Sequence, residues 1–459
     1  MTKNQYFTIS ERRFFLRLFD MLVVVGTIFI AASFKGFYYF DLSSERLVTW
    51  LITLSIYLIS FGQIFEMYDL KNSNDTYRIL RSIVLTALST NILYIFTPYI
   101  SPELPPNRLQ IIFLFLTIAL PLLIWRLIYI SFIFSPKYFN NLLLIGSTDE
   151  VKNLKEFIED KVPQNRVAGC ISSSKQTIDE LSCYDLETAN IEDVVKELNI
   201  TEIVVANYNT EVYSKIHSQL IHLFEQGTTI ISAKKFKVTE TLLLPELKLS
   251  DEFYDYITLS KNSNSRLYLI LLRLVDIIIS IIGLIFLLAI MPLILIGNLL
   301  GNRGVLFYNQ ERVGEKGNFF TIYKLRSMIK NAENDGPVWA EMNDKRITLF
   351  GKFLRNTRLD EVPQFYNILK GEMSLIGPRP ERPEFVSQLE KELPFYVIRH
   401  IIKPGLTGWA QVMHPYAANL KDQEMKLRYD LYYIKERNLI LDFKIIIKTF
   451  TTVLFFRGQ

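Results

Sequence analysis

The sequence has little cysteine and histidine, and what it has lacks the spacing of a metal site. Its two cysteines, Cys170 and Cys183, provide neither metal-ligand spacing nor a disulfide framework. The histidines are scattered along the chain as His217, His222, His400 and His414. We therefore expect any bound metal to be a hard ion with oxygen ligands.

The sequence also lacks a nucleic-acid recognition motif, although one part of it is basic. The whole chain has 51 Lys and Arg against 47 Asp and Glu, a net charge of +4. Residues 301–459 alone contain 25 basic and 18 acidic residues, a difference of +7. Anionic lipid, phosphate substrates or nucleic acid would each suit such a region. Without a motif we expect no nucleic-acid partner.

Long apolar runs dominate the first part of the chain. Each of them approaches or exceeds the ~20 residues that a helix needs to cross a membrane. They are Leu18–Phe34, Leu47–Phe65, Ile83–Tyr99 and Leu109–Phe134. The sequence therefore predicts a four-helix transmembrane bundle over residues 1–137. Arg126, inside the last run, is expected to extend to the membrane interface, with a functional role as the alternative.

The charges that flank these runs indicate their orientation. Eight basic residues lie before the first run, between the second and third, and after the fourth: Lys3, Arg12, Arg13, Arg17, Lys71, Arg78, Arg81 and Lys137. The opposite loops carry three: Lys35, Arg46 and Arg108. Basic loops face the cytoplasm, so both ends of the bundle are expected there.

A Rossmann-like α/β domain is predicted over residues 138–262. Strand-like segments at Leu142–Gly146, Val167–Ile171, Glu202–Ala206 and Thr229–Ile231 alternate with helical segments such as Asp149–Asp160. Only Gly146 remains of a G-x-G-x-x-G pattern. Without the second glycine, backbone cannot approach a pyrophosphate closely. We expect a structural or regulatory domain that binds no dinucleotide.

A further uncharged run, Ile277–Leu300, is long enough to cross the membrane. One crossing would place the basic residues 301–459 outside, against the positive-inside tendency. Pro292 removes a backbone hydrogen bond and bends or breaks the helix. We therefore predict a re-entrant helix over about 267–300, with Arg273 and Asp276 where it enters the membrane. An ordinary kinked span is the alternative.

Two adjacent carboxylates, Asp360 and Glu361, precede Pro363 in a short apolar-periodic segment. Because proline is tolerated in the first turn of a helix, both acids are expected at a helix N-terminus. The free N–H groups there suit phosphate. Arg355 and Arg379 lie nearby in sequence. This pattern suggests phosphoryl chemistry, with one acid attacking and one holding a divalent cation. On these residues alone, a helix cap followed by a plain turn is the favoured interpretation.

The sequence from about Ser265 to Gln459 resembles the monotopic phosphoglycosyl transferases, the bacterial sugar transferase family. The matching segments are RLVD, the proline within the apolar run, QERVG, FTIYKLRSM, LDEVPQFYNILKGEMSLIGPRP, KPGLTGWAQV and YDLYYIK. Together with the first 262 residues, the chain resembles the long, polyprenyl glycosylphosphotransferase form. One departure is Met291, where the family often has serine before the proline.

The resemblance implies a membrane protein whose third part, residues 263–459, is a mainly α catalytic domain with a re-entrant helix. It would transfer a sugar 1-phosphate from a UDP-sugar to undecaprenyl phosphate, releasing UMP, in exopolysaccharide or O-antigen biosynthesis. Asp360 would form an aspartyl phospho-sugar intermediate, and Glu361 would hold Mg²⁺. Arg355 and Arg379 would bind phosphate, with Lys324 and Arg326 as further candidates. Arg273, Asp276 and Pro292 would support the membrane helix.

Two other functions stay open from the residues alone. A polysaccharide transporter or polymerase would also have several membrane spans, but with polar residues concentrated inside them. A non-catalytic membrane scaffold would not need Asp360. The expected location is the bacterial inner membrane, with the catalytic domain on the cytoplasmic face, and a homodimer through the α/β domain is a further expectation. The motifs do not distinguish between sugars.

Overall fold

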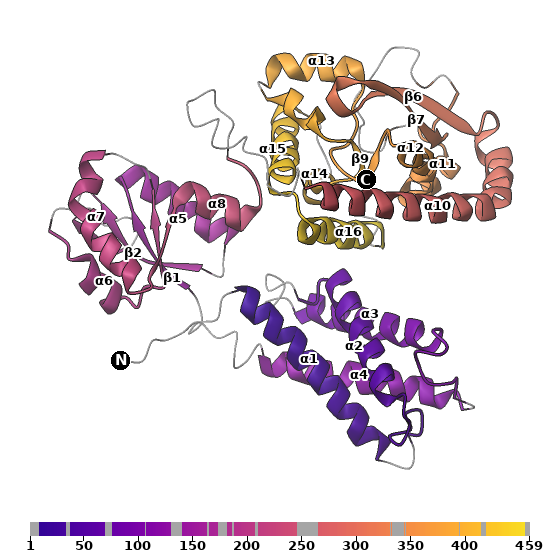
Figure 1. The fold of residues 1–459 in the computed structure, drawn as a ribbon, viewed down its shortest axis with the longest axis horizontal. Helices are drawn as coiled ribbons and strands as arrows, with labels where there is room; N and C mark the ends of the chain where they lie inside the picture. The colour runs from indigo at the N-terminus through magenta and orange to yellow at the C-terminus, as the bar shows by residue number, and fades with distance from the viewer. Residues whose placement is uncertain are drawn as a thin grey trace. The chain divides into compact units, whose positions relative to one another are not determined.

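The computed structural model describes residues 9–33, 37–68, 76–105, 107–129, 140–162, 165–172, 181–185, 188–206, 210–245, 265–330, 332, 344, 346–393, 395–414 and 419–454. The chain divides into two compact units, Met1–Phe236 and Lys237–Gln459. Figure 1 labels helices and strands of both units and colours the chain by residue number. The domain limits expected at residues 137/138 and 262/263 lie outside the described residues.

Long apolar helices form the first part of the chain, as the sequence predicts. They are α1 (Ile9–Ala32), α2 (Leu47–Ile64), α3 (Thr76–Ile95) and α4 (Leu109–Ile128). Leu54, Leu58, Leu114 and Ile118 lie in their shared core, and each is at most 1% exposed. Among the described residues, five helices are long and apolar enough to cross a membrane: these four and the helix within 266–302.

A buried ion pair joins the first and last of these helices. Arg126 of α4 donates from Nη2 to Asp20 Oδ2 of α1 at 2.7 Å, and both side chains are at most 6% exposed. The Arg126 guanidinium also lies 5.4 Å from the centre of the Tyr68 ring. The prediction that Arg126 extends to the interface is therefore wrong. Its charge has a partner 106 residues away, so it stays inside.

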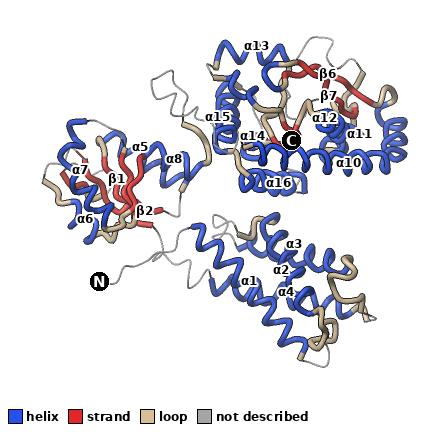
Figure 2. Tube along the Cα trace, viewed as in Figure 1, coloured by secondary structure: helices blue, strands red, loops and turns tan. Residues whose placement is uncertain are grey.

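A five-stranded parallel sheet forms the next part of the chain. Its strands, in the order β3-β2-β1-β4-β5, give the Rossmann-type arrangement that the sequence predicts. The elements are β1 (Asn140–Ile145), α5 (Thr148–Lys161), β2 (Asn165–Ser172), β3 (Cys183–Asp185), α6 (Ile191–Glu197), β4 (Glu202–Val205), α7 (Thr210–Glu225), β5 (Thr229–Ser232) and α8 (Ala233–Thr241). Figure 2 shows these strands in red, with helices α5, α6 and α7 beside them in blue. Apolar residues of β1 and β4 form the two faces of its core.

In the turn after β1, where a dinucleotide would bind, a side chain of the protein accepts the hydrogen bonds of Ser147. Both the backbone N–H and the hydroxyl of Ser147 donate to Glu150 Oε2, at 3.3 and 2.8 Å. A carboxylate at this helix start repels a pyrophosphate. The expectation that this domain binds no dinucleotide stays a prediction, and this geometry supports it.

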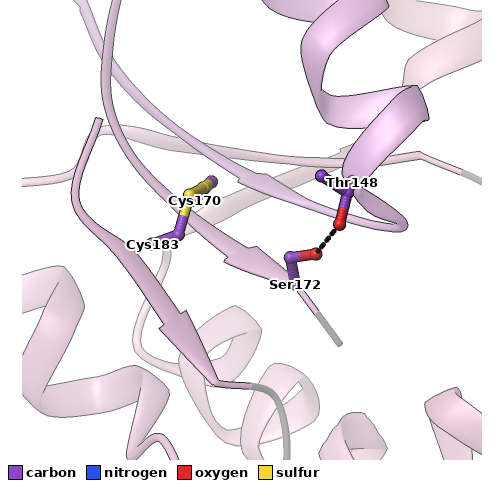
Figure 3. The surroundings of a disulfide bond; sticks show 4 residues. All are labelled: Thr148, Cys170, Ser172 and Cys183. Atoms are coloured by element: carbon purple, nitrogen blue, oxygen red, sulfur yellow. Dashed lines mark hydrogen bonds between the residues drawn. A yellow bond between two sulfur atoms is a disulfide. The ribbon is translucent and has the colours of Figure 1, made fainter. Parts of the chain in front are cut away.

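A disulfide connects the edge strand β3 to β2 (Figure 3). The parallel register places Cys170 directly opposite Cys183, with their Cα atoms 4.6 Å apart. The sequence analysis expected no disulfide framework from these cysteines, and the bond between them shows that this expectation is wrong. It missed β3 as well, because a three-residue strand shows no periodicity that distinguishes it from a loop.

The second unit is mainly α-helical. Its helices are α10 (Arg266–Gly297), α11 (Leu349–Asn356), α12 (Phe365–Lys370), α13 (Pro383–Glu392), α14 (Trp409–Met413), α15 (Leu420–Glu436) and α16 (Leu439–Leu454). Two short sheets accompany them: the antiparallel pair β6 (Phe307–Val313) and β7 (Phe319–Leu325), and the parallel pair β8 (Ser374–Ile376) and β9 (Gly405–Thr407). Trp409, Tyr396 and Tyr433 are the bulkiest residues of the core, each 1% exposed.

Helix α10 has one buried side and one exposed apolar side. The buried residues lie at helical spacing: Asp276, Ser280, Gly283, Leu287 and Ile294. The exposed side consists of large apolar residues, among them Ile270, Ile278, Ile285, Leu288 and Leu293, and each is more than half exposed. The α-helix continues through Pro292 to Gly297 and then widens into a π-helical turn, Asn298–Asn302. Pro292 therefore does not break the helix, and the predicted re-entrant course stays a prediction.

Removing one partner of the buried pair in the bundle should destabilise it strongly. Asp20→Leu leaves the Arg126 charge buried without its partner, at a cost of about 3–5 kcal/mol. The double variant Asp20→Leu/Arg126→Met removes both charges and should recover most of that loss. Thermal unfolding in detergent measures both variants. Asp41→Asn, at a fully exposed aspartate, is the control. A single variant as stable as the unaltered protein would contradict this role.

Candidate functional site

The two carboxylates lie at the start of a short helix, as the sequence predicts. A 3₁₀ segment (Leu359–Gln364) carries Asp360, Glu361 and Pro363, and α12 follows it directly. Arg358, just before the segment, adopts the left-handed conformation with φ 57°. That conformation is rare for a residue with a side chain, and here it turns the chain sharply between α11 and the carboxylates.

Basic side chains from separate segments surround Glu361. Arg379 donates from Nη2 to Glu361 Oε1 at 2.7 Å. Lys324 Nζ of β7 lies 3.5 Å from the same oxygen. Arg358 Nη1 lies 3.5 Å from Oε2. The structure thus brings together residues that are up to 55 positions apart in the sequence (379 − 324).

The adjacent carboxylates have different charge states. Burial raises the pKa of Glu361, but the charges of Arg379, Lys324 and Arg358 outweigh it and hold this pKa well below its usual range. Burial and the nearby Glu361 charge raise the pKa of Asp360 to about 6, despite Lys324 and Arg355. Glu361 is therefore firmly ionised, while Asp360 is ionised only near neutral pH and above.

Asp360 combines burial with an unused oxygen. It is 8% exposed, and its Oδ1 has no hydrogen-bond partner among the described residues. A buried carboxylate oxygen without a donor is costly unless a ligand uses it. This free oxygen, beside a concentration of positive charge, has the character of a nucleophile for an anionic centre.

The other basic residues named by the sequence analysis differ in their surroundings. Burial lowers the pKa of Lys324 to about 8. Arg355 donates from Nε to Ser327 Oγ at 2.9 Å, and the Asp360 charge partly offsets the lowering of its pKa by burial. Arg326 instead donates from Nη2 to the Asn302 carbonyl at 2.9 Å, in the segment after α10.

Arg273 and Asp276 of α10 support the segment that follows the carboxylates. Arg273 donates to the carbonyls of Ile368 and Leu369, at 2.6 and 2.7 Å, and so caps the C-terminus of α12. Asp276 Oδ1 accepts from the Leu375 N–H at 2.9 Å, at β8. These residues therefore hold the helix and strand on either side of Gly371 against α10.

Backbone contacts fix the loop that carries Arg379. The Gly377 N–H donates to the Thr407 carbonyl, and the Gly405 N–H donates to the Pro378 carbonyl, at 2.9 and 2.8 Å. A Cβ on Gly377 would lie 2.4 Å from the Lys403 carbonyl oxygen, and one on Gly405 would lie 2.1 Å from the Gly377 nitrogen. Only glycine allows the loop before Arg379 and the Lys403–Gly408 segment to approach this closely.

Sequence reasoning missed two contributors to the site. Arg358, which is not among the residues assigned to the site from the sequence, contacts Glu361. Asn367 was not singled out, although its side chain bonds Thr321, Tyr323 and Glu372 and is fully buried. It ties β7, which carries Lys324, to α12. A polar residue in the apolar-periodic stretch after Pro363 was the signal that could have identified it.

A divalent cation would find only part of its ligand set in this protein. The described residues include no group of three His, Cys, Asp or Glu side chains that could hold a metal. The available oxygens are Asp360 Oδ1 and Glu361 Oε2. The second of these lies 3.5 Å from Arg358 Nη1. Two carboxylates fit Mg²⁺ when phosphate oxygens and water complete the coordination.

Comparisons with known proteins identify a family and several relatives of this chain. The family model described as bacterial sugar transferase matches residues 267–456. The UDP-N-acetylgalactosamine-undecaprenyl-phosphate N-acetylgalactosaminephosphotransferase of Aeromonas hydrophila is 51% identical over 33% of this chain and 36% of its own length. The UDP-glucose:undecaprenyl-phosphate glucose-1-phosphate transferase of Xanthomonas campestris pv. campestris is 40% identical over 39% of this chain and 38% of its own length.

One relative matches over most of both chains. The galactosyl transferase CpsE of Streptococcus agalactiae is 31% identical over 69% of this chain and 72% of its own length. With the first two relatives, by contrast, the chain shares just over a third of their length. On the long match and the family model together, the chain belongs to the bacterial sugar transferase family.

Proposed function

We propose that the protein transfers a sugar 1-phosphate from a UDP-sugar to undecaprenyl phosphate. The observation that carries the proposal is the free, buried oxygen of Asp360 beside Glu361, which Arg379, Lys324 and Arg358 surround. Four basic side chains, including Arg355, act on two carboxylates, so the site has excess positive charge for a diphosphate. The names of the relatives specify this class of donor and acceptor.

The transfer proceeds in two displacements at phosphorus. In the first, an Asp360 carboxylate oxygen bonds to the sugar-bearing phosphorus, and the bond from that phosphorus to the bridging oxygen of UMP breaks. UMP leaves, and the sugar phosphate stays on Asp360. In the second, an oxygen of undecaprenyl phosphate bonds to the same phosphorus and displaces Asp360. One site thus serves a soluble donor and a membrane acceptor in turn.

Glu361 and its basic neighbours bind the diphosphate. Arg379 and Lys324 reach one oxygen of Glu361, so they can turn to phosphate oxygens beside it. We propose that Glu361 holds Mg²⁺, which neutralises charge on the diphosphate when it is bound. Arg355, hydrogen-bonded to Ser327, places a further positive charge near Asp360.

Asp360→Asn should abolish the first displacement while leaving the fold intact. The amide has nearly the same volume as the carboxylate but no nucleophilic charge, so UMP release should fall by at least about 10³-fold. The measurement is UMP release from a panel of UDP-sugars by purified protein in membranes, with and without undecaprenyl phosphate. Near-normal turnover by this variant would exclude Asp360 as the nucleophile.

Glu361→Gln is the matched comparison at the neighbouring position. This variant keeps Asp360 but loses the charge proposed to hold Mg²⁺. Its activity should therefore fall, and part of it should return as the Mg²⁺ concentration is raised. Asp360→Asn should gain nothing from added Mg²⁺. Activity of the unaltered protein in the presence of excess EDTA would contradict the metal role.

The pH dependence of kcat/KM should be bell-shaped. Activity should rise as pH increases through about 6, where the Asp360 carboxyl loses its proton. It should fall above about 8, where Lys324 loses its charge. Lys324→Arg keeps its charge at high pH, so this variant should lose the alkaline limb and retain the acid one. An alkaline limb unchanged in Lys324→Arg would assign it to another group.

We further propose that α10 enters and leaves the membrane on the same, cytoplasmic face of the bacterial inner membrane, and that α1–α4 form the membrane bundle. Contacts along α10 support this. Tyr268 near its start donates to Asp442 of α16 at 2.5 Å, Gly283 lies against Phe365, and Gly297 near its end lies against Phe350. The same unit contacts α10 from its start to its end. If α10 spanned the bilayer, these polar and charged segments would have to lie within the membrane.

Cysteine labelling in intact cells tests this topology. Single cysteines at Val305, after α10, and at Lys196 of the α/β domain should react only after the inner membrane is opened. Tyr99→Cys, in the loop expected outside, is the positive control. All are made with Cys170 and Cys183 replaced by serine, and all three positions are exposed. Labelling of Val305→Cys from outside would show that α10 spans the membrane.

A further inference from the structure

The backbone of the loop that carries Arg379 is held at consecutive carbonyl groups. The Pro378 carbonyl accepts from Gly405, and the Arg379 carbonyl accepts from Arg399 Nη2 at 2.9 Å. The Pro380 carbonyl accepts from Arg312 Nη1 at 3.2 Å, and the Glu381 carbonyl accepts from the Val313 N–H at 3.0 Å. Donors from separate segments therefore fix the course of this loop.

Arg399 is the donor that reaches the Arg379 residue itself. It is 3% exposed and lies in the 3₁₀ segment Tyr396–Ile401. Its Nη2 also donates to Asp430 Oδ2 of α15 at 2.9 Å, and its Nη1 donates to the Tyr396 hydroxyl. Arg379 is thus held at both ends: its carbonyl by Arg399 and its guanidinium by Glu361.

Stability alone does not explain this arrangement. Two charges taken out of water cost several kcal/mol each, and well-packed apolar residues in their place are often as stable. The planar fork of Arg399 does what an apolar side chain cannot, because it joins a fixed carboxylate on α15 to a loop carbonyl. Asp430, 2% exposed, belongs to the YDLYYIK segment, which the proposed reaction leaves without a role.

We infer that Arg399 and Asp430 are positioning residues of the carboxylate site, which set where the Arg379 guanidinium lies beside Glu361. This inference rests on the proposed function. Neither side chain contacts Asp360 or Glu361 in the hydrogen bonds and ion pairs of the described residues, so both act through Arg379. A shift of about 1 Å in a group that binds the reacting phosphate is enough to cost about 100-fold in rate.

Arg399→Lys tests the inference with little disturbance of the core. Lysine keeps the charge opposite Asp430, but its one nitrogen cannot replace both Nη1, which donates to Tyr396, and Nη2, which donates to Asp430 and to the Arg379 carbonyl. We expect kcat/KM for the UDP-sugar to fall by about 10- to 100-fold. In an Arg379→Ala background the same substitution should cause no further loss, because the group it positions is already absent.

Asp430→Asn extends the test to the other partner, and Tyr433→Phe is the matched control. The Tyr433 hydroxyl donates to Asp442 Oδ1 at 2.7 Å, in the same core and also from α15, but it does not contact the loop. Tyr433→Phe should lower the melting temperature and leave kcat/KM of the folded protein unchanged. Asp430→Asn should lower kcat/KM, and that loss too should vanish in the Arg379→Ala background.

Hydrogen exchange gives a readout that does not depend on activity. The peptide spanning residues 376–382 should exchange faster in Arg399→Lys than in the unaltered protein, and not in Tyr433→Phe. Equal losses of kcat/KM with and without Arg379, or unchanged exchange in Arg399→Lys, would overturn the inference. If the unaltered protein released no UMP, the proposed function would fail, and the exchange result would still decide whether Arg399 positions the loop.

Discussion

Two adjacent carboxylates cannot both stay charged inside a protein unless positive groups compensate at least one of them. In this protein the compensation goes to Glu361, through Arg379, Lys324 and Arg358. Asp360 is left with an oxygen that no described residue uses. Separate elements of the second unit supply the basic residues that compensate Glu361. Strand β7 carries Lys324, the left-handed turn carries Arg358, and the loop after β8 carries Arg379.

The parts of this arrangement that follow from local chemistry could be predicted from the sequence. Pro363 indicates a helix start, and the carboxylates lie there. Alternating segments indicate a parallel sheet, and the strand order is that of a Rossmann-type domain. Runs of about 20 apolar residues indicate membrane helices, and each of α1–α4 overlaps one run, although α1 and α3 begin several residues before theirs. In each, a short stretch of sequence carries its own structural signal.

The remaining features depend on which segments become neighbours, and sequence spacing does not contain that information. Asp20 meets Arg126 across 106 positions, and Arg273 meets α12 across 95. Two basic residues only two positions apart have separate roles: Lys324 of β7 reaches Glu361, while Arg326, just after that strand, contacts Asn302. Even Cys170 and Cys183, only 13 apart, are paired by the register of two parallel strands, which no spacing rule specifies.

The two-sided character of α10 has a practical consequence for work on this enzyme. Its exposed side is a continuous row of isoleucine, leucine and phenylalanine, and α16 adds Ile440 and Phe443. These residues belong to the unit that carries the chemistry, so they remain when α1–α4 are deleted. A shortened protein that begins near Lys237 would therefore still require detergent or lipid during purification, and aggregation in plain buffer would report this surface rather than misfolding.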